Sequence, residues 1–96
     1  MKRTNELSLK QALEGLVQDY GLGAKLDEQA IRVLWPDAVG AMINRHTTAL
    51  ALRRGTLTVT VDNAPLRQEL TYRRNELKTL MNERIQREVV IDLKVQ

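Results

Sequence analysis

Basic side chains recur at helical spacing in the stretch from residue 63 to residue 88. Arg67, Arg74 and Lys78 are seven and four residues apart, so they share one edge of a helix with 3.6 residues per turn. Arg74 and Lys78 are like charges one turn apart, and the helix does not neutralise them itself. Guanidinium and ammonium groups bind phosphate oxygens. The spacing favours a contact with nucleic-acid phosphates, and a merely solvated helix edge has the same pattern.

The other edge of the same stretch is acidic. Glu69, Glu76 and Glu83 recur every seven residues. Helical spacing predicts ion pairs of Glu69 with Arg73 and of Glu83 with Arg87. Carboxylates spaced along an exposed edge do not form the close pair that acid catalysis requires. We interpret this edge as solvated or as a docking surface for a protein partner.

The sequence has few residues of the types that enzymes use for catalysis. The chain has no cysteine and a single histidine, His46, which excludes a disulfide framework and a thiolate metal site. His46 has no carboxylate, serine or second ligand nearby in the sequence, and we expect it to cap carbonyl groups at a helix C-terminus. We predict a non-enzymatic protein with no catalytic residue, metal, cofactor or small-molecule substrate.

Length and charge set further bounds. The 96 residues indicate one domain, with residues 1–7 polar and flexible. The net charge of +3 is uneven: residues 1–44 carry 5 basic and 6 acidic residues, and residues 45–96 carry 10 and 6. The basic excess favours a polyanionic partner for the second half. Since neither a signal peptide nor an apolar run long enough to span a membrane is present, we expect a cytoplasmic protein without membrane contact.

Two helices are expected in the first half. Residues 8–20 have helical apolar spacing and end before glycines. A second helix is expected from an N-cap at Asp27 to about Asn44, kinked at Pro36, because the apolar phase continues across the proline. Its apolar residues are Ile31, Trp35, Ala38, Val39, Met42 and Ile43. We interpret Trp35 as a core residue, and Gly40 as a site where another backbone approaches closely.

A β-hairpin is expected next. Residues 49–53 and 56–62 flank Arg54-Gly55, and a two-residue turn sets Leu52 opposite Leu57. In this register one face is apolar. The other face is small and polar, formed by Ala49, Ala51, Arg53, Thr56, Thr58 and Thr60.

The remaining chain predicts one long helix and a third strand. Asn63 is the expected N-cap, with Pro65 in the first turn, and the helix buries Leu66, Leu70, Leu77, Leu80 and Met81. Residues 89–96 alternate as a half-buried strand. We therefore predict an α+β, two-layer fold in the order α-α-β-β-α-β, with helices on one face of a three-stranded sheet. We favour pairing of the third strand with the first, in the antiparallel sense.

A series of segments in order carries a likeness to a known family. They are Leu34-Trp35-Pro36-Asp37-Ala38-Val39-Gly40, residues 43–47, residues 52–61 and Glu69-Leu70. This series resembles the DciA family of bacterial replication proteins, from about residue 16 to residue 95. The resemblance implies a KH-like domain, interaction with the replicative helicase DnaB as a loader or operator, and DNA binding. It also implies that the chain is the compact domain alone, since many members have a long second region.

Three hypotheses follow. The first is a DNA-binding accessory protein of replication that contacts single-stranded or forked DNA through phosphates, without reading the sequence, by Arg67, Arg74, Lys78, Arg53 and Arg54. The second is a protein adaptor that does not bind nucleic acid and docks through Glu69, Glu76 and Glu83 or through the threonine face. The third is an RNA-binding KH-like module. It is disfavoured because the chain lacks the GxxG loop with which true KH domains bind single strands.

Overall fold

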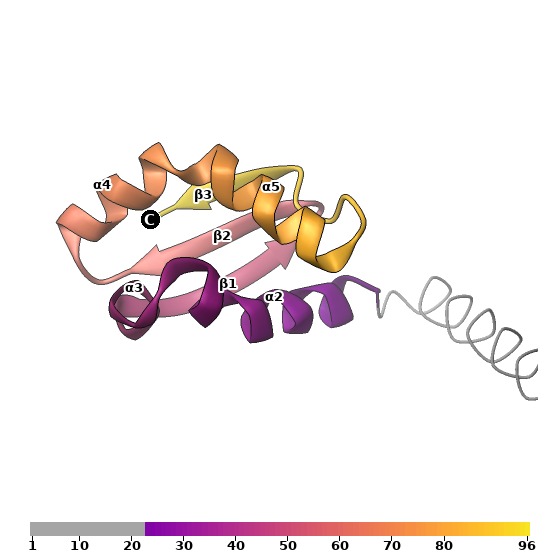
Figure 1. Ribbon diagram of the computed structural model, residues 1–96, viewed down its shortest axis with the longest axis horizontal. Coiled ribbons are helices and arrows are strands. Elements are labelled where there is room, and N and C mark those ends of the chain that lie inside the picture. Colours follow the sequence, from indigo (N-terminus) through magenta and orange to yellow (C-terminus); the bar gives the residue numbers. More distant parts are fainter. Residues whose placement is uncertain (1–22) are drawn as a thin grey trace, which may run out of the picture.

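The computed structural model describes residues 23–96, so the helix expected over residues 8–20 and the flexible segment expected over residues 1–7 lie outside the described residues. The α+β class is confirmed (Figure 1). The described elements are α2 (Gly23–Val39), α3 (Ala41–His46), β1 (Thr47–Arg53), β2 (Thr56–Val61), α4 (Ala64–Tyr72), α5 (Arg74–Ile85) and β3 (Asp92–Val95).

The described elements form two layers. In Figure 1, α2 lies along β1, and the pair of α4 and α5 lies along β3. The inward side chains of the sheet share one core with those of the helices, because alternate strand residues point to the same face. The strand residues of this core are Leu50, Leu52, Leu57, Val59, Val61 and Leu93, and the helices add Ile31, Trp35, Ile43, Leu66, Leu70, Leu77 and Met81. The opposite sheet face carries the expected small and polar residues.

The hairpin has the predicted register. Leu52 lies opposite Leu57, and Leu50 lies opposite Val59, in an antiparallel pair. The turn residues Arg54 and Gly55 have φ angles of 50° and 81°, as expected for a two-residue turn with both central residues at positive φ. A Cβ atom on Gly55 would lie 2.7 Å from Ile91 Cδ1, so a larger residue here would also have to displace the exposed Ile91 side chain.

The third strand pairs differently from our prediction. β3 is parallel to β2 and the sheet order is β1-β2-β3, so the favoured pairing with β1 was wrong. The outer edge of β1 is already occupied by α2: the Leu52 N–H donates to Glu28 Oε2 at 2.9 Å, and Arg32 Nη2 donates to the Leu50 carbonyl at 2.6 Å. A third strand at this edge would lose both bonds.

The chain before β3 is held by one side chain. Asn82 Oδ1 accepts from the N–H groups of Val89 and Val90 at 3.0 and 2.8 Å, and its Nδ2 donates to the Val90 carbonyl at 2.9 Å. Val90 is fully buried and Ile91 is 62% exposed. The alternation expected from residue 89 is therefore wrong before Asp92, and β3 is shorter than predicted.

The single kinked helix of residues 27–44 is two helices. Pro36 lies inside α2, and the break comes at Gly40, with φ 90° and ψ 164°. Asp27 also lies inside α2, so it is not the N-cap. No other part of the described structure lies within 4 Å of a Cβ placed on Gly40, so the expected close approach was wrong and glycine is required by the backbone conformation.

The role predicted for Trp35 is confirmed. Its side chain is 1% exposed within the core. Its indole Nε1 donates to Thr47 Oγ1 at 3.0 Å, and that hydroxyl donates to the Ile43 carbonyl at 2.7 Å. The only tryptophan thus joins α2 to the start of β1. Met42, by contrast, is 64% exposed despite its place in the expected apolar series.

Gly40→Ala tests the conformational requirement. The φ and ψ of Gly40 lie in a region that is essentially restricted to glycine, so we expect a loss of about 1–3 kcal/mol in the free energy of unfolding without any steric clash. Urea denaturation of both proteins measures it. A change below about 0.5 kcal/mol, the range of ordinary surface substitutions, would contradict this account of the helix break.

Glu28→Gln tests the ionic contact at the β1 edge. The backbone N–H of Leu52 and then the Arg32 guanidinium hold the pKa of Glu28 below its ordinary value. A lowered folded-state pKa stabilises the fold above the unfolded pKa, about 4.3, and this contribution disappears as the pH falls through the folded value. Unfolding free energies should therefore favour the wild type at pH 7, by a margin that shrinks below about pH 4. A difference in unfolding free energy between the wild type and Glu28→Gln that stays constant from pH 7 to pH 3 would contradict the lowered pKa of Glu28.

Candidate nucleic-acid interface

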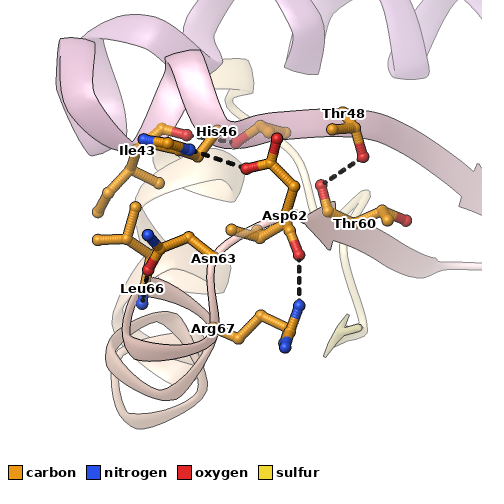
Figure 2. A network of polar contacts seen from close by, with 10 residues as sticks. Ile43, His46, Thr48, Thr60, Asp62, Asn63, Leu66 and Arg67 are labelled. Atoms are coloured by element: carbon orange, nitrogen blue, oxygen red, sulfur yellow. Dashed lines mark hydrogen bonds and ion pairs between the residues drawn. The ribbon is translucent and has the colours of Figure 1, made fainter.

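The basic edge is carried by the helix pair that follows the hairpin. Asn63 caps α4 as predicted, because its Oδ1 accepts from the Leu66 N–H at 3.0 Å (Figure 2). Pro65 lies in the first turn of the helix. The expected apolar stripe faces the core: Leu66, Leu70, Leu77 and Met81 are buried, and Leu80 is partly buried.

The predicted long helix is broken at Arg73 into α4 and α5. Arg73 has φ −96° and ψ 7°, and its N–H bonds to the carbonyls of Glu69 and Leu70 at 3.1 Å. At regular helical spacing Arg73 falls near the centre of the apolar stripe, and a guanidinium is almost never fully buried. The break leaves this side chain 34% exposed. A single long helix was therefore wrong.

Arg67 is anchored at one end of the basic edge. Its Nη1 donates to the Val61 carbonyl at 2.8 Å, at the end of β2 (Figure 2). The side chain is half-buried. A guanidinium has five N–H donors, so one internal bond leaves donors for a phosphate. The internal bond also fixes the direction of the guanidinium before any ligand arrives.

Arg74 and Lys78 continue the edge on α5. Arg74 is exposed and Lys78 is partly buried. They lie one turn apart within the same helix. Within residues 23–96, no ion pair joins either of them or Arg67 to a carboxylate. Their positive charge therefore remains available to an external anion.

Arg53 and Arg54 lie at the opposite end of β2 from Arg67. Both are exposed at the hairpin turn before β2, whereas Arg67 contacts Val61 at the far end of the same strand. Five residue steps of about 3.3 Å separate the two ends of β2, or about 17 Å. The structure does not bring the hairpin arginines together with Arg67.

The acidic edge is exposed, but its ion pairs differ from those predicted. Arg73 Nε lies 3.6 Å from Glu76 rather than beside Glu69. Arg87 pairs with Asp27 of α2 rather than with Glu83. Within the described residues, Glu69 and Glu83 form no ion pair. The turn at Arg73 brings its side chain to Glu76. The neighbouring helix α2 supplies Asp27 as the partner of Arg87.

A histidine–carboxylate contact was missed. His46 Nδ1 lies 2.8 Å from Asp62 Oδ1, and the Asp62 N–H donates to the His46 carbonyl at 3.0 Å (Figure 2). The two residues are 16 positions apart, and no local pattern pairs them. The His46 ring bonds no serine or threonine hydroxyl in the described structure, so the contact ties the ends of β1 and β2 together without a nucleophile.

Neither a metal cluster nor a spanning helix is found between residues 23 and 96. No group of three or more histidine, aspartate or glutamate side chains there could hold a metal ion. In the same part of the chain, no helix has the length and apolar character needed to cross a membrane.

The comparison with protein families decides the identity of the chain. The sequence model of the family described as Dna[CI] antecedent, DciA, matches residues 8–95. The chain belongs to the DciA family. DciA is a family of accessory proteins of the replicative helicase DnaB and not a known class of enzymes. Membership therefore supports a replication accessory role and interaction with DnaB for this DciA protein.

The DciA fold seen here, helices on one face of a three-stranded mixed sheet, is compatible with a KH-like domain. No curated protein matches the chain.

Arg67→Ala and Arg74→Ala form a matched pair. Arg67 donates to a backbone carbonyl and Arg74 is exposed without an ion pair in the described structure, so we expect Arg67→Ala to lower the unfolding free energy by about 1 kcal/mol and Arg74→Ala to change it by less than about 0.5 kcal/mol. Urea denaturation compares them. Equal losses would mean that the Arg67 bond to β2 does not stabilise the fold.

Proposed function

We propose that this DciA protein is a non-enzymatic, DNA-binding accessory protein of replication. Arg67, Arg74 and Lys78 contact the phosphates of single-stranded or forked DNA. The observation that carries the proposal is an edge of three cations without ion-pair partners in the described structure. Family membership supports the replication setting.

The length of the edge suits a phosphate backbone. Arg74 and Lys78 are four residues apart within α5, about 6 Å along a helix that rises 1.5 Å per residue. One strand of a duplex carries a phosphate every 3.4 Å of axis, so these two side chains parallel about two phosphates, and Arg67 on α4 extends the contact. The internal bond of Arg67 reduces the side-chain entropy lost on binding.

Binding of this kind is indifferent to sequence. Among residues 23–96, the basic edge carries no aromatic side chain on which a base could stack, since Trp35 is buried and Tyr72 lies between Glu69 and Glu76 in the sequence. Arginine and lysine contacts to phosphates position a nucleic acid without reading its bases. Affinity therefore depends on charge and on salt concentration.

The hairpin arginines form a second, separate contact. Arg53 and Arg54 lie at the other end of β2 from Arg67, so a short oligonucleotide on the helix edge need not reach them. A forked DNA has two arms that diverge from one point. We infer that such a substrate uses both sites and gains affinity over a short single strand.

The adaptor hypothesis also has support of its own. The exposed acidic edge and Tyr72 are unsuited to phosphates and suited to a protein partner. The two roles occupy different edges of the same helix pair, so one protein can combine DNA contact with partner contact. Binding of RNA in place of DNA is an outcome of the experiment below.

Charge reversal tests the DNA contact. We expect the wild type to bind labelled single-stranded and forked DNA with a slope of log K against log salt of about −2 to −4, for three to five phosphates. Arg74→Glu with Lys78→Glu should weaken binding about tenfold or more and reduce the magnitude of the slope by about 1 to 2. Fluorescence anisotropy at several salt concentrations gives both values.

The control carries the same change of charge elsewhere. Lys25 and Arg45 are exposed on α2 and α3, and Lys25→Glu with Arg45→Glu alters the net charge equally. If both double variants weaken binding alike, only net charge matters and the site assignment fails. Absence of wild-type binding at low salt would reject the DNA function, and tighter binding of matched RNA would replace it with RNA binding.

A further inference from the structure

The outward face of the helix pair, away from the basic edge, combines acidic and apolar side chains. We call it the α5 outer surface and define it by Glu69, Tyr72, Glu76, Leu80 and Glu83. Within α5, Arg74 and Glu76 are two residues apart and so about 200° apart around the helix axis. The basic edge and this surface therefore face different sides, and a ligand of one leaves the other free.

Tyr72 is the most exposed large apolar residue of the described structure, at 81%. It lies three residues after Glu69 and four before Glu76, the spacings at which helical side chains are neighbours. The Leu77 N–H still bonds to the Arg73 carbonyl at 2.9 Å across the break. Two flanking carboxylates repel phosphates, so this ring is poorly placed to stack a nucleic-acid base. Exposed tyrosines are frequent anchors at protein interfaces.

A shallow groove extends the surface along α5. It has a volume of about 420 Å³ and is lined by Asn75, Glu76, Thr79, Leu80 and Glu83. Leu80 is the apolar residue of this lining, and Glu76 and Glu83 are exposed. An open groove with an aliphatic side chain and carboxylates fits a side chain from another protein better than an enclosed small molecule.

Length and charge specify the occupant. The surface runs from Glu69 on α4 across the break at Arg73 to Glu83 on α5. Its α5 part, from Glu76 to Glu83, covers seven residue steps, about 11 Å along the helix axis, which matches two turns of a helix laid beside it. In the described structure only Arg73 pairs with this surface, at 3.6 Å from Glu76, whereas Glu69 and Glu83 have no ion pair. The remaining negative charge calls for a basic partner.

We propose that the α5 outer surface docks a basic amphipathic helix of a partner protein. Apolar side chains of that helix pack on Tyr72 and into the groove at Leu80. Its lysine or arginine side chains face Glu69, Glu76 and Glu83. This binding mode is a helix laid along an exposed apolar strip with complementary charges at the rim. It rests on the adaptor role proposed above for this edge, specifies its partner, and does not depend on DNA contact.

A second copy of the chain is a poorer occupant. In a two-fold symmetric contact the same patch meets itself, so glutamates would face glutamates. Such like charges oppose association. Self-association through this surface is therefore an outcome that the experiment must exclude.

A model peptide tests the proposal. The probe is a labelled 18-residue helical peptide with leucines on one face and lysines on the other, compared with the same peptide carrying glutamates. We expect only the lysine peptide to bind, with about tenfold weaker binding to Tyr72→Ala and a similar loss for Glu76→Lys with Glu83→Lys. Fluorescence anisotropy measures binding, and amide NMR shifts should be larger at Glu69, Tyr72, Leu80 and Glu83 than at Arg74 and Lys78.

Control variants distinguish peptide binding at this surface from non-specific binding elsewhere on the protein. A measurement of DNA affinity distinguishes it from the DNA contact. Val33 is 69% exposed on α2, so Val33→Ala removes an exposed apolar side chain elsewhere, and Asp37→Lys removes an exposed carboxylate on the same helix. Neither should weaken peptide binding. DNA affinity of Tyr72→Ala should equal that of the wild type, so the two proposals fail independently.

Several results would overturn the proposal. They are no binding of the lysine peptide, equal binding of both peptides, no effect of the Tyr72 and glutamate variants, or shifts centred on the threonine face. Concentration-dependent shifts at residues 69–83 in the free protein would assign the surface to self-association instead. Because Tyr72, Glu76 and Glu83 are exposed, their variants should fold, and unchanged melting temperatures verify that.

Discussion

The contact between α2 and the outer edge of β1 constrains the rest of the fold. Glu28 and Arg32 satisfy the Leu52 N–H and the Leu50 carbonyl, which point away from β2. An edge strand with free backbone groups attracts another strand. Here Glu28 and Arg32, which are one helical turn apart and form an ion pair, occupy that edge. The third strand therefore adds at the free edge of β2.

A parallel third strand requires the chain to return along the whole sheet. The return is made by α4 and α5, which lie along β3. Asn63 starts the crossover, and the Asn82 side chain fixes the backbone of residues 89–90 where it ends. Because only one stripe of this helix pair is buried, the residues on its two flanks are exposed or partly exposed. The positions of both the basic and the acidic edge follow from the topology of the sheet.

The sequence predicted those parts of the structure that depend on neighbouring residues. Alternation around Arg54-Gly55 gave the hairpin register, and the type of residue at Asn63 gave the helix cap. The pairing of β3 could not be predicted, since it depends on hydrogen bonds between Glu28 and Leu52, 24 residues apart. The contact of His46 with Asp62 could not be predicted either, because the two residues are 16 positions apart in the sequence.

Element boundaries inside helices were the other failure. The apolar phase runs through Gly40 and Arg73, so periodicity alone indicated continuous helices. The breaks arise from a backbone angle at one residue and from the exposure that a guanidinium requires at the other. For the candidate site, spacing predicted that Arg67, Arg74 and Lys78 share one edge of a continuous helix, whereas Arg67 lies on α4 and the other two lie on α5. It could not show that Arg67 is bonded to β2 or that Arg53 and Arg54 lie at the opposite end.

The central proposal is that the basic edge and the acidic edge of one helix pair bind separate ligands. The most direct test is an amide NMR titration of the isotope-labelled protein with a short single-stranded oligonucleotide at low salt. The account predicts that shifts concentrate around Arg67, Arg74 and Lys78 and leave Glu69, Tyr72 and Glu83 unchanged. Shifts centred on those three residues, or on the threonine face of the sheet, would contradict it.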